Sequence, residues 1–172
     1  MITAETYATS AANGVSGHAK TSDAVLNPML FYERTSSTYN NWCSEAQATT
    51  YLWNDTQAAL ASGKKSIFDP SPAGWKLPTI TADSSAGTPW YGLTVNLTSS
   101  VATFFTNAKY PASGNRDYAT GAMYGVGTLG YYWSASPSST TYGYGLYFGS
   151  SFVTPASTNS RSSGRQVRPV LE

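Results

Sequence analysis

The sequence predicts an α+β fold of short, mostly antiparallel strands with one or two short helices. Residues 130–170 alternate between apolar positions and positions filled by Tyr, Ser, Thr and Gly, and this period of two is typical of strands. Residues 42–62 instead have the best helix-forming composition of the chain, and Gly63 follows as a stop signal. The 172 residues suit one main core. We divide them into an N-terminal arm or linker, residues 1–20, and one domain, residues 21–172.

The first half of the chain predicts few strands. The arm is rich in Ala, Thr, Ser and Gly, with one strand near Thr3–Thr9. The apolar run Val25–Tyr32 is broken by Asn27-Pro28, which fits an edge strand or a turn. Lys64–Phe68 predicts a further strand. The next segment, DPSPAGWKLPT, contains three prolines and predicts a rigid loop packed by Trp75.

The middle of the chain mixes loops and strands. Ile80–Gly92 has a loop-like composition. Val101–Phe105 is an apolar run that predicts a buried strand. Lys109–Arg116 and Gly121–Val126 follow, and we expect them to form a strand pair.

The C-terminal alternation divides the side chains into two faces. The face that we expect to meet the core holds Tyr131, Trp133, Ala135, Tyr142, Tyr144, Leu146, Phe148, Val153 and Val167. Two end residues of this face, Tyr131 and Tyr142, could equally lie at an exposed rim. The other face carries one tyrosine among glycines, Tyr147, followed by the outward-pointing Phe152. Buried Trp75, Trp133, Leu146 and Phe148 are predicted to supply much of the core.

The charge content excludes several kinds of partner. Charged residues are only 11% of the chain, the formal net charge is +1, and no run of Lys or Arg occurs. A nucleic-acid or anionic-membrane partner would require a basic surface, so we expect neither. No stretch approaches the roughly 20 apolar residues of a membrane helix. The N-terminus lacks the pattern of a signal peptide, and we interpret the chain as part of a longer exported protein.

No arrangement of residues predicts catalysis, a metal or a cofactor. His18 lies in the arm without a partner at ligand spacing, and Cys43 is the only cysteine. The acidic residues are scattered and show no paired spacing. The triplet Trp53-Asn54-Asp55 resembles part of a calcium-binding sugar site, but a helix cap is the simpler interpretation. We therefore expect a non-enzymatic protein with no cofactor.

The tyrosine-rich surface instead predicts binding. Tyrosine gives a large contact area at small entropic cost, and Ser, Gly and Asn add adaptable hydrogen bonding. The simpler alternative is that these residues only solvate a surface of low charge. The candidate ligand-binding residues are Asn115, Asp117, Tyr124, Thr128, Leu129, Tyr131, Tyr142, Tyr147, Phe152, Thr154, Ser157, Thr158 and Asn159.

Several segments together resemble one family. They are SIFDPSPAGWKLPT, YPASGNRDYATGAMYGVGTLGYYWSASP, YGLYFGSSFVTP and GRQVRPV, preceded by AVLNPMLFY and NNWCSEAQATTYLWND. Over roughly residues 20–170 the chain resembles the major paralogous domain first named in Fibrobacter and abundant in surface proteins of gut Bacteroidetes. The resemblance implies a C-type-lectin-like fold. It also implies a location at the cell surface or outside the cell, on a bacterial outer membrane or a phage.

The chain is also similar to the variable proteins of diversity-generating retroelements, which use this fold. Those proteins keep scaffold residues fixed and vary the ones between them. The resemblance implies a scaffold of Trp133, Leu146, Phe148, Val153, Pro155, Arg161, Gly164, Val167 and Arg168. The candidate binding residues would then be the diversified ones.

The departures from the family narrow these expectations. Ser71 and Pro169 stand where some members carry cysteines, so that disulfide is absent. The acidic and amide residues that hold calcium in sugar-binding C-type lectins are missing as a set. Formylglycine-generating enzymes share the fold, but the chain lacks their active-site cysteines.

Taken together, the sequence predicts a non-catalytic adhesin or receptor-recognition domain that binds a protein or glycan on another cell or subunit. The predicted contact is the Tyr/Ser/Thr-rich face of residues 115–165, with diversification by a retroelement as an added hypothesis. The alternative is a structural domain at a fimbrial tip or stalk that contacts another subunit.

Overall fold

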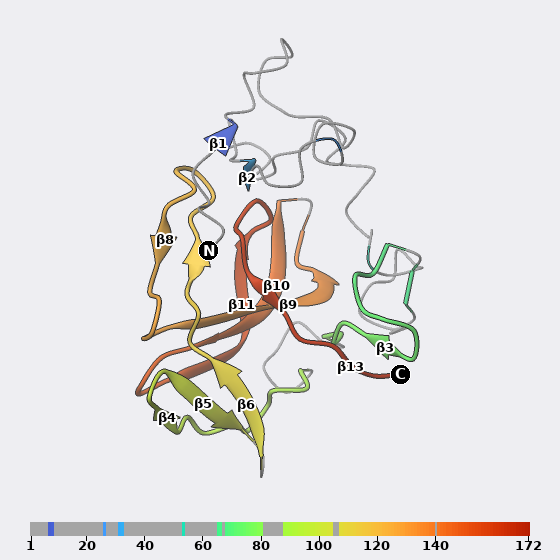
Figure 1. Cartoon of the computed structure of the whole chain (residues 1–172). Coiled ribbons are helices and arrows are strands. Elements are labelled where there is room, and N and C mark those ends of the chain that lie inside the picture. Colours follow the sequence, from blue (N-terminus) through green and yellow to red (C-terminus); the bar gives the residue numbers. More distant parts are fainter. Residues whose placement is uncertain are drawn as a thin grey trace.

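The structure is a computed structural model. It describes residues 7–8, 26, 31–32, 53, 65–66, 68–80, 88–104, 107–139 and 141–172. The regular elements of these residues are short β-strands, and most of them lie in the second half of the chain (Figure 1).

The strands have the following bounds in chain order. They are β1 (Tyr7–Ala8), β2 (Phe31–Tyr32), β3 (Trp75–Lys76), β4 (Leu97–Thr98), β5 (Val101–Phe104), β6 (Ala108–Pro111), β7 (Asn115–Arg116), β8 (Met123–Tyr124), β9 (Gly130–Pro137), β10 (Tyr142–Phe148), β11 (Val153–Ser160), β12 (Gln166–Val167) and β13 (Val170–Leu171).

The α+β prediction is wrong, because the described part of the chain is nearly all β and has no helical element among the strands above. Its composition explains this: from residue 88 onwards it is rich in Gly, Ser, Thr and Tyr, which favour turns and strands over helices. The one helix-forming stretch, residues 42–62, lies outside the described residues except for Trp53. The C-type-lectin-like arrangement expected with those helices is not confirmed.

A four-stranded sheet organises the structure, with the strand order β11-β10-β9-β12. Strands β9, β10 and β11 form an antiparallel meander, and the short strand β12 pairs with β9 in parallel (Figure 1). Strand β10 is irregular: its register shifts by a bulge against both neighbours. Strand β9 is buried along almost its whole length, so it forms the centre of the fold.

One face of this sheet packs on the main core. It presents Tyr132, Tyr144, Leu146 and Phe148, which cluster with Ile80, Trp90, Ala102, Tyr110 and Ala112. The ring of Phe148 lies over Gly130, where a Cβ atom would collide with it. We call this side of the sheet the core face.

Polar groups on the core face are satisfied by nearby backbone. The Tyr132 hydroxyl donates to the Pro111 carbonyl oxygen over 2.7 Å. The Ser134 hydroxyl donates to the Tyr144 carbonyl oxygen over 2.8 Å, and Ser136 Oγ accepts from the Ile80 amide over 2.8 Å. These bonds offset the cost of burying hydroxyl groups inside an apolar cluster.

The predicted core residues of β9 are buried, as are most of those predicted for β10, but the expected face of β9 does not meet the main core. Tyr144, Leu146 and Phe148 are buried, as expected. In β9, however, Tyr132 lies opposite Leu146, while Tyr131 lies opposite Tyr147. Directly paired residues share one side of a sheet, so the expected face of β9 is turned away from the main core. Alternation within one strand is readable from sequence, but the register between two strands is not.

Two other core predictions are corrected. Trp75 is 43% exposed and Val167 is 41% exposed. Val167 pairs with Trp133, which turns it to the side opposite the core face. The buried tryptophan of the main core is instead Trp90, which is 2% exposed and donates from Nε1 to the Tyr110 hydroxyl.

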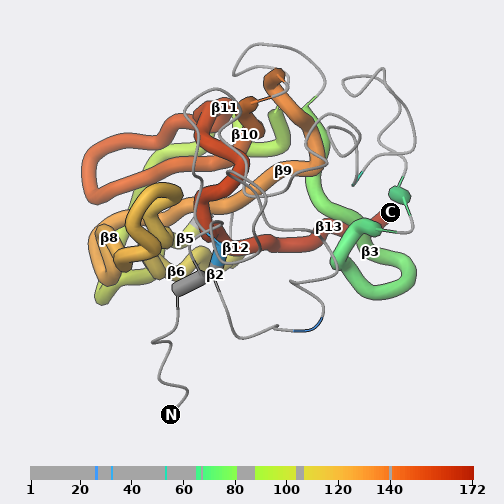
Figure 2. The backbone as a smooth tube through the Cα atoms, turned by 90° about the horizontal axis from the view of Figure 1, so that it is seen from above, coloured from blue at the N-terminus to red at the C-terminus, as the bar shows by residue number. Residues whose placement is uncertain are grey.

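Smaller sheets surround the central one. Strands β4, β5 and β6 form a three-stranded sheet, whereas the pairing expected for residues 109–116 is found only between β7 and β8. Strands β1 and β2 pair in parallel inside two of the expected strand regions. Strands β3 and β13 pair at the C-terminal end, on the side of the central sheet away from β8 (Figures 1 and 2).

Residues 68–78 include a loop that is held in shape by the side chains of Asp69 and Lys65, not by Trp75. No strand is found at the described residues of 64–68. The buried Asp69 carboxylate accepts from the amides of Ser71 and Leu77, and Lys65 Nζ donates to the carbonyl oxygens of Pro72 and Trp75. The prolines and these bonds together give the turn its shape.

The packing of Leu146 gives the first prediction. Replacing this fully buried residue by Ala should lower the free energy of unfolding by about 2–5 kcal/mol, because it removes apolar contacts and leaves a cavity. The matched control is Leu171→Ala, since Leu171 is 69% exposed and its loss should change stability by less than about 0.5 kcal/mol. Urea unfolding of both variants measures this, and equal effects would contradict the placement of the core.

Candidate functional site

The side of the central sheet opposite the core face carries a group of aromatic rings. Tyr147 of β10 lies directly opposite Tyr131 of β9, and Gly145 lies opposite Trp133. Val167 of β12 pairs with Trp133, and alternation places Arg165 on the same side as Val167. We call this side, with Phe152 from the turn before β11, the aromatic face.

Three rings form a continuous ladder across the aromatic face. Tyr131 and Tyr147 are stacked, with ring centroids 4.6 Å apart and an interplanar angle of 12°. Phe152 meets Tyr147 edge to face, with centroids 4.7 Å apart. Tyr131 is 7% exposed and Phe152 is 36% exposed, so the ladder begins in the interior and ends at the surface. Aromatic pairs in these two geometries are favourable and hold the rings in place.

Arg165 packs its guanidinium against the other end of the ladder. The Arg165 Cζ atom lies 4.8 Å from the ring centroid of Tyr131 and 4.5 Å from that of Trp133, which are cation–π distances. Its nitrogens Nε, Nη1 and Nη2 are buried and have no hydrogen-bond partner. Loss of hydration lowers the pKa of Arg165 to about 10.

Glycines in β10 leave room for the rings. A Cβ atom on Gly143 would lie 3.2 Å from the Trp133 ring, tighter than an ordinary contact. The alternation in the sequence predicted one tyrosine among glycines on this face. Gly143 is the floor on which Trp133 lies, which helps to explain how this large ring is only 7% exposed on a sheet face.

Strand β11 adds small polar side chains to the aromatic face. Thr154 lies opposite Tyr147, Ser157 opposite Gly145 and Asn159 opposite Gly143, so all three share the side of Tyr147. Asn159 Nδ2 donates to Ser157 Oγ over 3.3 Å. The face therefore combines a rigid aromatic ladder with a polar edge.

The predicted binding residues fall into three groups. Six of them lie on the aromatic face: Tyr131, Tyr147, Phe152, Thr154, Ser157 and Asn159. Tyr142 and Thr158 lie on the other side of the sheet, because Thr158 pairs with the core residue Tyr144 and Tyr142 pairs with Ser160. The remaining five belong to the segment that leads into β9 and contains β7 and β8: Asn115, Asp117, Tyr124, Thr128 and Leu129.

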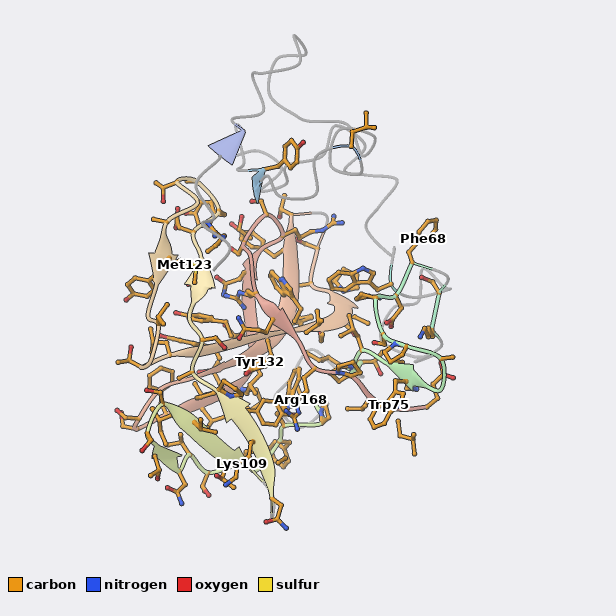
Figure 3. All side chains as sticks on the ribbon, in the orientation of Figure 1. Phe68, Trp75, Lys109, Met123, Tyr132 and Arg168 are labelled. Atoms are coloured by element: carbon orange, nitrogen blue, oxygen red, sulfur yellow. The ribbon has the colours of Figure 1, made fainter. Side chains whose placement is uncertain are left out.

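The segment of residues 113–129 runs along the border of the aromatic face. Arg116 exchanges two backbone hydrogen bonds with Gly164, the residue before Arg165. Tyr124 is close enough to Tyr131 to raise the pKa of that phenol further. Met123, Tyr124 and Val126 are 52%, 61% and 62% exposed, and Met123 lies on the outer edge of the molecule (Figure 3).

Asp117 has a structural role within that segment. Its Oδ1 accepts from the amides of Ala119 and Thr120 and from the Thr120 hydroxyl, at 2.9–3.0 Å. A carboxylate with three local donors holds its own turn closed. The ligand contact expected of Asp117 stays a prediction.

Arg165 is not among the predicted binding residues. The motif GRQVRPV was interpreted as scaffold and Val167 was placed on the core face, so Arg165 was not considered as part of a binding surface. The two arginines in fact lie on opposite sides: Arg168 packs 4.5 Å over the Tyr110 ring and donates to the Lys109 carbonyl oxygen. Figure 3 shows Arg168 beside Tyr132, on the side of Lys109. A single arginine directly before a short strand forms no pattern in the sequence that would mark it as part of a site.

The groups on the aromatic face are suited to non-covalent contact. Among the described residues, no group of three or more His, Cys, Asp and Glu side chains could hold a metal ion. No helix in that same part of the chain is long and apolar enough to cross a membrane. The face offers ring surfaces, hydroxyl and amide groups, and one buried cation.

Comparisons with known proteins give one match. Residues 98–170, which contain the whole aromatic face, match the model of a domain of unknown function, DUF8237. No curated protein and no solved structure is significantly similar to the chain.

Two buried phenols give a prediction on pH. Burial raises the pKa of Tyr132 to about 12 and raises that of Tyr131 still more, from a usual value near 10. The folded chain therefore keeps protons that the unfolded chain releases, so stability that is complete below pH 10 is lost as the pH rises towards 12. The lowered pKa of Arg165 acts in the opposite sense and offsets part of this loss.

The measurement is urea unfolding at pH 9 and pH 11.5, with Tyr132→Phe as the comparison. The wild type should lose on the order of 1–2 kcal/mol more than the variant between these two pH values. Each protein is compared with itself, so the lost hydrogen bond to Pro111 cancels. Equal losses would show that Tyr132 is not buried as described.

Proposed function

We propose that this chain is a non-catalytic binding module that recognises its partner through the aromatic face. The observation that carries the proposal is the ladder of Tyr131, Tyr147 and Phe152, which is anchored in the interior and emerges at the surface. It lies on the sheet side that the main core does not use.

The ladder suits recognition because its rings are already ordered. A ring that is fixed before binding loses little conformational entropy when a partner covers it. Phe152 and Tyr147 are held by each other, while the hydroxyl and amide groups of β11 adapt to polar atoms. Rings that served only to solvate the chain would not need to be stacked.

The setting that we propose is a bacterial or phage surface protein. Its support is the low charge of the chain, together with the resemblance of its motifs to the major paralogous domain. Diversification by a retroelement is an added proposal for the same residues. It requires a near-copy of the coding sequence beside a reverse transcriptase gene, with mismatches at template adenines, and the absence of such a copy would refute it.

A second candidate function is structural contact with another subunit, as in a fimbrial tip or stalk. The observation that favours it lies at the other end of the molecule. Trp75 and Leu171 are directly paired and are 43% and 69% exposed. Exposed large apolar side chains that gather in this way mark contact surfaces. The two functions use different surfaces and are compatible.

The binding proposal predicts the result of removing the outer rings. The double variant Tyr147→Ala, Phe152→Ala should bind at least about tenfold more weakly, because ring contacts at an interface typically contribute more than 1 kcal/mol each. Ligands for this measurement come from panning a displayed random-peptide library and from a glycan array, both screened with the wild type.

The control is Tyr91→Ala, since Tyr91 is 63% exposed and lies outside the aromatic face. Its binding should equal that of the wild type. Thermal melting of all variants is measured in parallel. A collapse of melting in the double variant would assign the rings to the core, and unchanged binding with normal melting would place the binding site elsewhere.

A further inference from the structure

Arg165 carries a positive charge for which the described part of the chain supplies no counter-charge. All three of its guanidinium nitrogens are buried and lack a hydrogen-bond partner. The residue as a whole is only half-buried, so its exposed area lies along the stem and backbone. The charged group is thus covered by other groups of the folded chain, and a ligand reaches it only when a covering side chain moves aside.

The carboxylates of the described residues are accounted for elsewhere. Asp69 accepts two backbone amides in the loop before β3, and Asp117 accepts three donors in its own turn. Glu172 follows β13, and its amide bonds to Gly74 on the far side of the central sheet. None of these three carboxylates bonds to Arg165, whose guanidinium nitrogens have no hydrogen-bond partner.

The aromatic partners compensate for only part of this burial. Rings above a guanidinium attract it through their faces, but they accept nothing from its N–H groups, which point along the edge of the plane. Buried N–H groups without acceptors are costly, and more so when they carry charge. The unpartnered acceptors nearby are Asn115 Oδ1 and Ser163 Oγ, both neutral.

We propose that Arg165 anchors a carboxylate of a protein ligand, supplied by an Asp or Glu side chain that docks on the aromatic face. This inference rests on the binding function proposed above and names the ligand chemistry of that same face. A guanidinium presents a planar fork of donors that matches the two oxygens of a carboxylate. Tyr131 and Trp133 hold the plane of that fork fixed before the ligand arrives.

The border of the face favours a protein over an acidic sugar. The exposed side chains around it are mainly apolar: Phe152, Val167, Tyr124, Met123 and Val126. Among the polar groups of β11, Asn159 and Ser157 already bond to each other, which leaves fewer of them for the many hydrogen bonds of a sugar. A peptide segment with an acidic residue between apolar ones matches both the cation and its surroundings.

The experiment pans a displayed random-peptide library on the wild-type chain and measures the affinity of the enriched peptides. We expect enriched peptides to share an Asp or Glu flanked by apolar residues. Replacing that acid by its amide should weaken binding at least tenfold, and Arg165→Met should do the same. Lys109→Met is the matched control, because it removes an exposed cation outside the face and should leave the affinity unchanged.

Thermal melting of Arg165→Met without ligand separates this role from a structural one. The methionine keeps an apolar stem between the rings and removes an uncompensated charge, so the melting temperature should stay equal or rise. A fall of several degrees would instead show that Arg165 is already paired within the folded chain, for example with Asn115, and would overturn the proposal.

The remaining outcomes distinguish this inference from the binding function. The enriched peptides could require Tyr147 and Phe152 but carry no acidic residue and bind Arg165→Met with unchanged affinity. That result would refute the carboxylate anchor and leave the binding function intact. If the chain binds only acidic members of the glycan array, and Arg165→Met loses this binding, the carboxylate comes from a sugar and the proposal of a protein ligand is refuted. If no ligand is found whose binding depends on Tyr147 and Phe152, both proposals are refuted.

Discussion

Strand β9 is buried on both of its sides, and this constraint organises the rest of the structure. One side, led by Tyr132, must meet the main core, and the other, led by Tyr131 and Trp133, must be covered as well. The covering groups come from two other elements: Tyr147 of β10 and Arg165 before β12, while Gly143 of β10 leaves the space in which the Trp133 ring lies. A strand of this kind can only be the centre of a sheet.

Because β9 is buried on both sides, the two faces of the sheet have different roles. On the core face every large residue points at another apolar residue and the serines bond to backbone, so this side specifies the fold. On the aromatic face the packing ends at a half-exposed ring and at a cation without an acceptor. A surface with these properties gains contacts when a partner covers it. The proposed binding function and the proposed carboxylate anchor therefore involve the same face.

The sequence predicted the strands better than their mutual placement. The alternation in residues 142–148 correctly predicted the core residues of β10, because side chains alternate between the two faces along any single strand. The orientation of β9 was wrong since it depends on the register of Leu146 against Tyr132 and on bulges that no local pattern encodes. Because the register between strands could not be predicted, only six of the thirteen binding candidates lie together on the aromatic face, and Tyr142 lies on the other side of the sheet. Arg165 was overlooked for the same reason.

The central claim is that the two faces tolerate change differently. Its most direct test is saturation substitution of the displayed chain, with resistance to protease as the measure of folding. At Phe152, Thr154, Ser157 and Asn159 we expect most substitutions to leave resistance unchanged, whereas at Leu146 and Phe148 only similar apolar residues should do so. Equal intolerance at both sets would contradict the account and show that the aromatic face is a second core.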